Sequence, residues 1–384
     1  MSPRRSRSAA ARRATAITVA ALAFGAAAAG CSKSTITPPQ SAASSTATAP
    51  AAPAAVSDLV TKSHTESGLI LYGNTPTAVM QPLLDAFAKA YPWIKPAYSQ
   101  LSDNQVYTKF QSEHAQGART ADLLISDAIP QALQAEQNGL IADVTPQGLA
   151  NFPHYIDQGH GVFVMSPDPV LTAWNTKTLS GADVPTSYAQ LAADIKADPA
   201  KYPLVSYSPA NPLGYNAVYG LDHVLGAAAV TGYLATYGPH TKTFDEGLDG
   251  LTYLAGGGAS FGWLSSGLAQ AVVPQYKGLI KYGYMTDATP LTPRLISQTA
   301  GAASSASAQL FLDFVYSNPG QQVMCAAGME ASMSGFKPAT GCTADLTDLA
   351  THVDPSTEFL VPVTQDVVNQ QKAITAGWNK ALGH

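Results

Sequence analysis

The sequence has few charged residues and no basic stripe. Asp, Glu, Lys and Arg make up 12% of its 384 residues, and the formal net charge is −5 at pH 7. That charged share is about half the usual one. Domains that bind nucleic acid carry clustered Lys and Arg, so we expect no nucleic-acid partner. Apolar residues at 46% support a real core, and the length allows two domains.

The chain also lacks an apolar run long enough to span a membrane as a mature helix. Its run at Ala16–Ala29 has signal-peptide length and follows an arginine-rich segment. The run ends in Ala-Ala-Gly-Cys31, which resembles a bacterial lipobox. This resemblance implies a signal peptide over residues 1–30, cleavage before Cys31 and lipidation of Cys31. Plain secretion with an incidental Cys31 is the alternative.

A tract rich in Ser, Thr, Ala and Pro follows the lipobox. This composition cannot bury a core, so we predict a disordered tether over residues 31–60. A lipid and a tether together would hold the folded part at a membrane surface. We therefore expect an exported protein that is anchored to the outer face of the bacterial cytoplasmic membrane.

Cysteine is scarce, with three residues in all. Besides Cys31, only Cys325 and Cys342 remain. In an exported protein such a pair predicts a disulfide. No neighbouring residue suggests a metal ligand, so we expect neither a metal site nor a cofactor.

The segment Gly68–Tyr91 predicts a strand, a polar turn and a helix. The apolar run at residues 69–72 is broken by Gly73-Asn74, and Thr75-Pro76 has the pattern of an N-cap followed by proline. Apolar residues then recur at helical spacing, although Pro82 is discordant within a helix. In an open α/β sheet, ligands bind where such turns leave the carboxyl ends of strands.

The same layout recurs along the chain. A strand at residues 121–126 precedes Asp127, a predicted helix N-cap, and a strand at residues 203–207 precedes the turn Ser208–Gly214. Extended segments are predicted at residues 279–285 and 290–299, and helices at residues 304–317 and about 357–382. Alternation of this kind predicts an α/β fold with parallel strands.

Several of these segments, taken in order, resemble extracellular solute-binding proteins of ABC importers for ferric ion, thiamine, phosphonates and related solutes. They are GLILYGNTPTAVMQPLLDAFAKAYP, ADLLISD with ALQAEQNGL, VLTAWNTKTL with VPTSYAQL, and AQLFLDFVYSNPGQQVM. The resemblance implies a type II periplasmic-binding fold with two lobes, a hinge and an interlobe cleft. It implies a first lobe at residues 61–174, a second at 175–287, and a return to the first at 288–384. It further implies a monomer that is no enzyme and that delivers a small polar solute to ABC permease subunits.

We expect the polar turns at the strand ends to face this cleft and bind the solute. Helix N-termini behind three of these turns favour an anionic or strongly polar ligand. Arg294 could likewise pair with a carboxylate or phosphate. Asp127 indicates an amine-bearing ligand instead, unless it only caps its helix. Trp263 is either a flat wall of the site or a core residue. The predicted ligand-binding residues are Asn74, Thr75, Ser126, Asp127, Ser208, Asn211, Trp263, Ser265, Ser266 and Arg294.

Three other interpretations remain. Ferric-binding members often present adjacent tyrosines, and the sequence has no Tyr-Tyr pair, which makes iron the less favoured ligand. Residues 258–262 fit the G-x-S-x-G pattern of a serine hydrolase around Ser260. However, glycines precede Ser260 and an apolar strand follows it, which is the reverse of a nucleophile elbow. A ligand-binding component of a sensor or cell-surface complex is the third interpretation, because one fold serves both roles.

Overall fold

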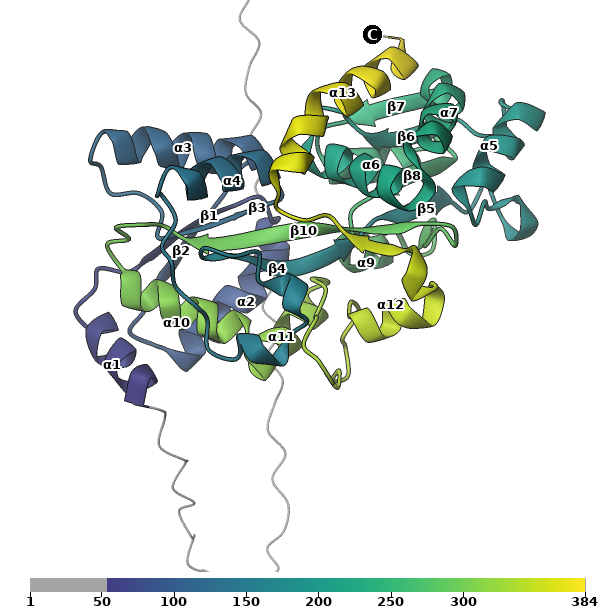
Figure 1. Cartoon of the computed structure of the whole chain (residues 1–384). Coiled ribbons are helices and arrows are strands. Elements are labelled where there is room, and N and C mark those ends of the chain that lie inside the picture. Colours follow the sequence, from purple (N-terminus) through teal and green to yellow (C-terminus); the bar gives the residue numbers. More distant parts are fainter. Residues whose placement is uncertain (1–53, 384) are drawn as a thin grey trace, which may run out of the picture. The chain divides into compact units, whose positions relative to one another are not determined.

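Two β-sheets, each covered by helices, form the part of the chain that the computed structural model describes, residues 54–383 (Figure 1). The first sheet has the order β11-β10-β3-β1-β2, with β4 paired to β10. Its strands are β1 (Leu69–Gly73), β2 (Pro96–Gln100), β3 (Leu123–Ser126), β4 (Val162–Pro169), β10 (Thr289–Gln298) and β11 (Glu358–Leu360). The mixed α/β class predicted from the sequence is confirmed.

The second sheet has the order β7-β6-β8-β5-β9. Its strands are β5 (Leu171–Asn175), β6 (Leu204–Tyr207), β7 (Thr241–Phe244), β8 (Phe261–Ser265) and β9 (Ile280–Gly283). In each sheet three neighbouring strands pair in parallel, β1 with β2 and β3, and β6 with β7 and β8. Each of these parallel sets directs its carboxyl ends to one edge, which is where ligand sites form in such sheets.

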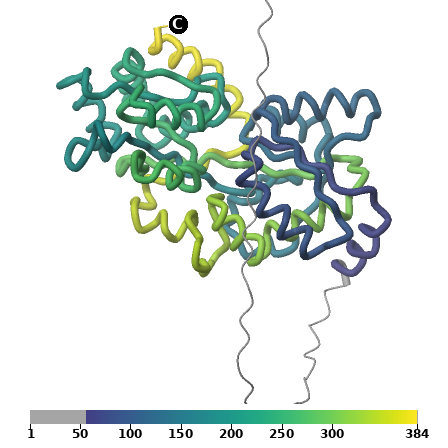
Figure 2. The backbone as a smooth tube through the Cα atoms, turned by 180° about the vertical axis from the view of Figure 1, so that it is seen from behind, coloured from purple at the N-terminus to yellow at the C-terminus, as the bar shows by residue number. Residues whose placement is uncertain are grey.

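Helices follow most of these strands and bury one face against the sheets. The first six are α1 (Ala54–Ser63), α2 (Thr77–Ala90), α3 (Asp103–Ala115), α4 (Ile129–Gln137), α5 (Tyr188–Ala197) and α6 (Pro212–Leu225). The others are α7 (Ala227–Tyr237), α8 (Gly247–Ala255), α9 (Ala269–Val272), α10 (Ser305–Val315), α11 (Asn318–Ala326), α12 (Leu346–His352) and α13 (Gln365–Leu382). Figure 2 follows the same path from behind.

Two predicted helix caps are wrong. The N-cap of α2 is Pro76 and not Thr75, and the Gln100 side chain accepts the hydrogen bond from the Thr77 N–H at 2.8 Å. The N-cap of α4 is Ala128 and not Asp127. In both cases the side chain interacts with the buried Arg294 and not with the N–H groups at the start of its helix. Residue spacing in the sequence does not reveal such a distant partner. Pro82 lies within α2.

The last residues of the predicted tether are helical, which corrects its boundary at residue 60. Helix α1 starts at Ala54, and Val56, Leu59 and Val60 pack against the first core. Their spacing gives the helix one apolar side, a pattern that the small residues around them obscured. Cys31, the predicted signal peptide and the rest of the tether lie outside the described residues.

Two chain segments connect the sheets. One is β4 followed by β5, and the other is β9 followed by β10. They lie side by side, because the Val170 N–H donates to the Pro290 carbonyl at 2.8 Å. β5 already belongs to the second sheet, and the predicted lobe boundaries remain a prediction.

The C-terminal helix α13 contacts elements of both halves. It packs on α4, which follows β3, and on α6 and α7, which belong to the second half. Its Val367 lies in the first core, and its Trp378 lies in the second. The predicted helix from about residue 357 starts later, at Gln365, because residues 358–360 form β11 beside β10.

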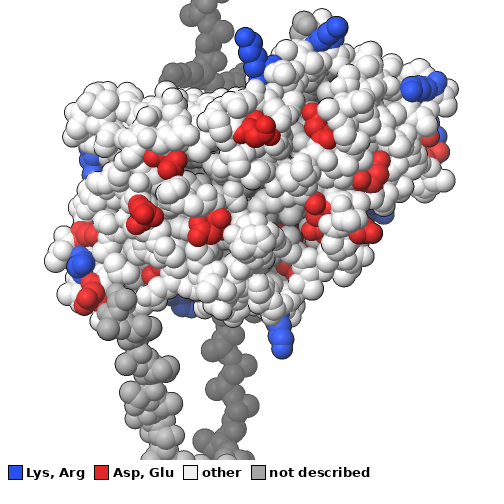
Figure 3. Space-filling model, viewed as in Figure 1, with Lys and Arg blue, Asp and Glu red and all other residues white. Residues whose placement is uncertain are grey.

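Cys325 and Cys342 are paired in the structure, with their Cα atoms 4.8 Å apart. They join the end of α11 to the loop before α12. Within residues 54–383, no helix combines the length and the apolar character that crossing a membrane requires. Charged side chains are sparse on the face seen in Figure 3, and the basic ones lie mostly toward its edges.

Candidate functional site

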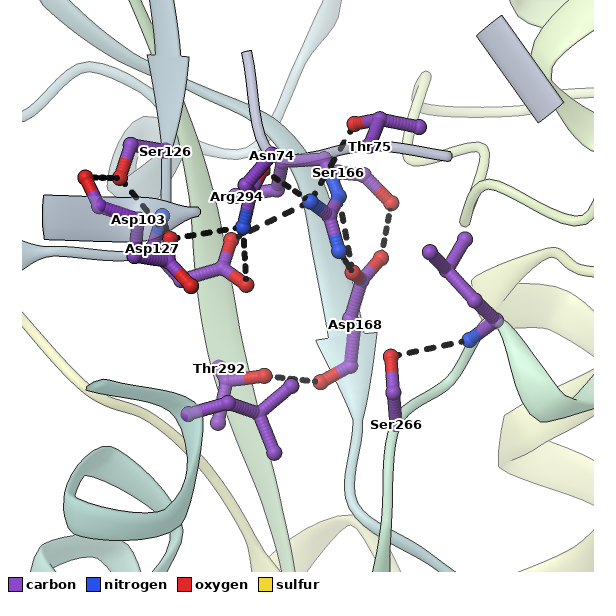
Figure 4. Close-up of polar contacts among 12 residues, drawn as sticks. Asn74, Thr75, Asp103, Ser126, Asp127, Ser166, Asp168, Ser266, Thr292 and Arg294 are labelled. Atoms are coloured by element: carbon purple, nitrogen blue, oxygen red, sulfur yellow. Dashed lines mark hydrogen bonds and ion pairs between the residues drawn. The ribbon is translucent and has the colours of Figure 1, made fainter. Parts of the chain in front are cut away.

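Arg294 is the centre of a buried polar cluster on the first sheet (Figure 4). It lies on β10, opposite Ser166 of β4 and beside a register shift between the two strands. Its Nε and Nη2 both donate to Asp168 Oδ2, at 3.1 and 2.7 Å. Asp168 Oδ1 in turn accepts a hydrogen bond from Ser166. A guanidinium removed from water needs such partners for its donors.

The other side of the guanidinium faces the turn after β1. Arg294 Nη1 donates to Asn74 Oδ1 at 2.6 Å and to Thr75 Oγ1 at 3.2 Å. The Asn74 amide nitrogen donates hydrogen bonds to two carboxylates, to Asp103 Oδ1 at 2.7 Å and to Asp127 Oδ2 at 3.0 Å. The turn after β1 is therefore held by the charges around it.

Asp103 joins this turn to the end of β3. Its Oδ1 accepts from the Ser126 hydroxyl at 2.9 Å and from the Asp127 N–H at 2.8 Å, in addition to the Asn74 amide. The hydrogen-bonding capacity of this oxygen is therefore already taken up by three donors of the protein itself. The Asp127 carboxylate, by contrast, is 3.5 Å from Arg294 through Oδ1, which is an ion pair and not a hydrogen bond.

The second half of the chain supplies Asn216, Tyr207 and Glu246. Asn216 of α6 donates from Nδ2 to the Asp127 carbonyl at 2.8 Å. Tyr207 ends β6, and burial, together with the charges of Asp127 and Asp103, raises its pKa. Glu246 precedes α8 and is exposed, and its pKa is raised by partial desolvation and by the charge of Asp103. Tyr207, Glu246 and Ser265 line a small cavity at the carboxyl ends of β6 and β8.

Carboxyl groups outnumber basic groups in this region. Burial, together with the charges of Asp103 and Asp168, raises the pKa of Asp127 to about 8 against the lowering effect of Arg294. Burial raises the pKa of Asp103 as well. Glu330, whose N–H is bound by Ser166, has a pKa well above its usual value because it is buried and faces Asp168. The buried carboxyl groups therefore resist ionisation.

Two buried oxygens of the cluster accept no hydrogen bond. They are Oδ1 of Asp127 and Oδ1 of Asn216, and the two residues are 2% and 0% exposed. The amide orientation of Asn216 is fixed because its Nδ2 faces the Asp127 carbonyl, which needs a donor. Buried acceptors are normally satisfied, so this part of the cluster has unused capacity for a donor.

The structure brings half of the predicted ligand-binding residues together. These residues share hydrogen bonds or ion pairs, and they are Asn74, Thr75, Ser126, Asp127 and Arg294. Arg294 is occupied by groups of its own chain. Whether any of these residues binds a solute remains a prediction.

The predicted residues of the second half mostly serve their own turns. Asn211 is the N-cap of α6, accepting from the N–H groups of Leu213 and Gly214. The Ser208 and Ser266 hydroxyls accept from backbone N–H groups two residues on. A side chain on Gly267 would clash, with a Cβ 2.9 Å from Pro169, so the turn at residues 265–267 lies against the segment that connects the sheets.

Trp263 lies in the second core at 1% exposure. Its ring packs beside those of Tyr237 and Trp378, and its indole N–H donates to Thr241 at 3.3 Å. Of the two interpretations of Trp263, these contacts favour the core residue. Ser260 directly precedes β8 and is 4% exposed, so it sits before a strand and not after one.

Sequence reasoning missed several members of the cluster. Five are buried, namely Asp103, Asp168, Tyr207, Asn216 and Glu330, and the sixth is the exposed Glu246. A signal was present at Asp168, a carboxylate between two prolines in an extended apolar segment, and at Asn216, an amide inside a buried helix. Burying either side chain without hydrogen-bonding or charged partners costs folding free energy, so its position inside an apolar segment indicates a buried polar contact.

Comparisons with known proteins identify the family. The sequence model described as bacterial extracellular solute-binding protein matches residues 72–322. Among solved structures, the substrate-binding protein of an ABC transporter from Agrobacterium tumefaciens is similar, with a TM-score of 0.72, 17% identity, and coverage of 82% of this chain and 95% of that one.

Two further structures have the same fold. The iron-bound HitA of Pseudomonas aeruginosa has a TM-score of 0.65 and 16% identity, covering 82% of this chain and 99% of that one. AfuA of Actinobacillus pleuropneumoniae, with fructose-6-phosphate bound, has a TM-score of 0.66 and 16% identity, with coverages of 82% and 98%. A search of curated sequences found no match. The chain belongs to the bacterial extracellular solute-binding proteins, with the type II periplasmic-binding fold of ABC importer components.

Proposed function

We propose that this protein captures a small polar solute at the Arg294–Asp127 cluster, between its two sheets, and delivers it to the permease of an ABC importer. Members of its family bind solutes for transport and are not enzymes. The observation that carries the proposal is the hydrogen bond from Asn216 to the Asp127 carbonyl. This bond joins a buried side chain of α6, in the second half, to the turn that follows β3, in the first half.

The connecting segments support a hinge at this site. Asp168 and Arg294 sit on the paired strands β4 and β10, just before and after the chain passes between the sheets. Thr292 adds a hydrogen bond to the Asp168 carbonyl at 3.1 Å. A solute that binds next to Arg294 would therefore act directly on the strands about which the halves rotate.

Entry of the solute requires the two halves to part. The cavity beside Tyr207 and Glu246 is small, and Asn216 bridges the halves at Asp127. Separation would expose the Asp127 carboxylate, and renewed closure would enclose the solute. The predicted lipid on Cys31 would keep this cycle at the membrane that carries the permease.

A thermal-shift screen of the purified protein tests the proposal. At 100 times its dissociation constant, a solute adds about 2.7 kcal/mol to the free energy of unfolding. Calorimetric titration of each hit should give one site per chain, and Asn216→Ala and Thr75→Ala should weaken its binding. Gln81→Ala, on the exposed side of α2, is the matched control. A hit that binds both cleft variants as tightly as the parent protein would contradict the proposed site.

A further inference from the structure

We propose that the solute is a cation with N–H donors, a primary amine in its ammonium form, and that it binds at Asp127 and Asn216, whose Oδ1 atoms accept no hydrogen bond. This inference rests on the proposed function and specifies its substrate class. It differs from the expectation that Arg294 marks an anionic solute.

The state of Arg294 removes the main argument for an anion. Its donors are directed at Asp168, Asn74 and Thr75, at distances of 2.6 to 3.2 Å. A phosphate or carboxylate would have to displace these buried partners and leave Asp168 without its counter-charge. Breaking one side of a buried ion pair is strongly unfavourable.

The surrounding charge favours a cation. Asp127 and Asp168 form ion pairs with Arg294, and Asp103 accepts a hydrogen bond from the Asp127 N–H. The exposed Glu246 of the second half interacts electrostatically with Asp103. One guanidinium cannot neutralise all of these carboxyl groups. An anion entering here would oppose the ionisation of these carboxyl groups further, whereas an ammonium would favour the ionised form of Asp127 and pair with it.

The unused hydrogen-bonding capacity specifies the kind of cation. Oδ1 of Asp127 and Oδ1 of Asn216 are buried acceptors without donors. An ammonium group carries N–H donors that fit such oxygens. A quaternary ammonium has the same charge but no N–H group, so it would leave both acceptors unsatisfied.

A metal ion fits these residues less well. Calcium takes six to eight oxygen ligands, whereas Asp103 Oδ1 already accepts three hydrogen bonds and Asp168 is bound to Arg294 and Ser166. Among residues 54–383, the group of His, Cys, Asp and Glu side chains that converges closely enough for a metal is Cys325, Cys342 and Asp345. That group lies elsewhere and includes the paired cysteines.

The experiment compares matched probes by thermal shift and calorimetry at pH 7.5. We expect 1,4-diaminobutane and agmatine to raise the melting temperature and to bind one per chain. The N-permethylated derivative of 1,4-diaminobutane should bind at least tenfold more weakly. Glycerol phosphate, citrate, Ca²⁺ and Fe³⁺ should bind more weakly than the primary amines. If no primary amine raises the melting temperature, the inference is overturned.

Two variants locate the interaction. Asp127→Asn keeps the shape of the side chain but cannot ionise to pair with an ammonium, and it should weaken amine binding by at least tenfold. Asp85→Asn, on the exposed side of α2, should leave it unchanged. Equal binding of 1,4-diaminobutane to Asp127→Asn and the parent protein would refute the role of Asp127.

The outcomes separate this inference from the proposed function. If glycerol phosphate or citrate binds, and Asn216→Ala weakens it, the cleft is the site but the substrate class is wrong. If a probe binds and neither Asn216→Ala nor Asp127→Asn affects it, the solute binds outside the cleft and both proposals fail.

Discussion

Arg294 and Asp168 form a buried, two-donor ion pair that links the strands leading into and out of the second sheet. Both donors meet the same oxygen, and both residues are at most 2% exposed. The pair therefore contributes to the fold and to the charge balance of the cleft at the same time.

Loss of the Asp168 carboxylate should destabilise the protein. In Asp168→Asn the Arg294 charge stays buried without its main partner, which costs about 3–5 kcal/mol. Urea unfolding measures this difference. Asp183→Asn is the control, because Asp183 pairs with Lys201 at the surface, where such pairs contribute about 0–1 kcal/mol. Equal losses in the two variants would argue against a structural role for the buried pair.

Stability should depend on the protonation of Asp127. Its pKa is raised to about 8 by burial and by Asp103 and Asp168, despite Arg294, whereas an unfolded Asp has a pKa of about 3.9. Between these values the folded protein binds more protons than the unfolded chain, so the free energy of unfolding contributed by this group falls as pH rises from about 4 to 8. Above pH 8 the loss is complete.

Asp127→Asn removes this titration. The variant should gain stability relative to the parent protein as pH rises from 5 to 8, measured by urea unfolding at each pH. The free energy of unfolding of Asp85→Asn should vary with pH in parallel with that of the parent protein across the same range. A parallel curve for Asp127→Asn would show that Asp127 titrates normally in the folded protein.

The Cys325–Cys342 pair should be oxidised in the exported protein. Thiol titration of denatured, unreduced mature protein should find neither cysteine free. Closing a loop of 17 residues stabilises by about 3 kcal/mol in the chain-entropy model, so Cys342→Ser should lower the free energy of unfolding by a similar amount. Cys342→Ser measured against the reduced parent protein separates the bond from the side-chain change.

Cys31→Ser should release the protein from the membrane. The lipid predicted on Cys31 is attached to its sulfur, which serine lacks, and within the described residues no helix is suited to span a membrane. Cell fractionation with immunodetection is the measurement, and Ser32→Ala is the neighbouring control. Membrane retention of Cys31→Ser would contradict the predicted anchor.

Trp263→Phe should affect stability and not solute binding. The indole packs beside Tyr237 and Trp378 in the second core, so its replacement leaves unfilled volume there. The midpoint of chemical unfolding should shift to a lower denaturant concentration. Calorimetry should give the same affinity as the parent protein for any probe that binds. A selective loss of affinity would restore Trp263 as a wall of the site.

The sequence predicted the fold well because its strands and helices carry strong local patterns. Apolar runs followed by polar turns placed β1 and β3. The helical spacing of Leu310, Phe311, Phe314 and Val315 placed α10. Local patterns failed where distant residues decide the outcome. Asp127 has the position of a helix cap, but Arg294, far away in the chain, sets its environment.

Part of the candidate site could not be predicted from the sequence, again because residues far apart in the chain determine it. Asn216 lies within a helix whose other buried residues are mostly apolar, and only the packing of α6 near β3 shows which backbone carbonyl its amide reaches. Trp263 illustrates the reverse error. A large aromatic near a polar turn suits a binding wall and a core equally well, and burial decides between them.

The position of α13 has a consequence for how quickly a solute exchanges. This helix contacts α4 on one side and α6 and α7 on the other, and the Tyr215 hydroxyl of α6 donates to its Val367 carbonyl. If the halves part, α13 has to leave one of these neighbours. That step adds a barrier to opening, and association that waits on a conformational change is slower than ordinary docking. We therefore expect long residence times, with the C-terminal helix controlling the lifetime of the complex.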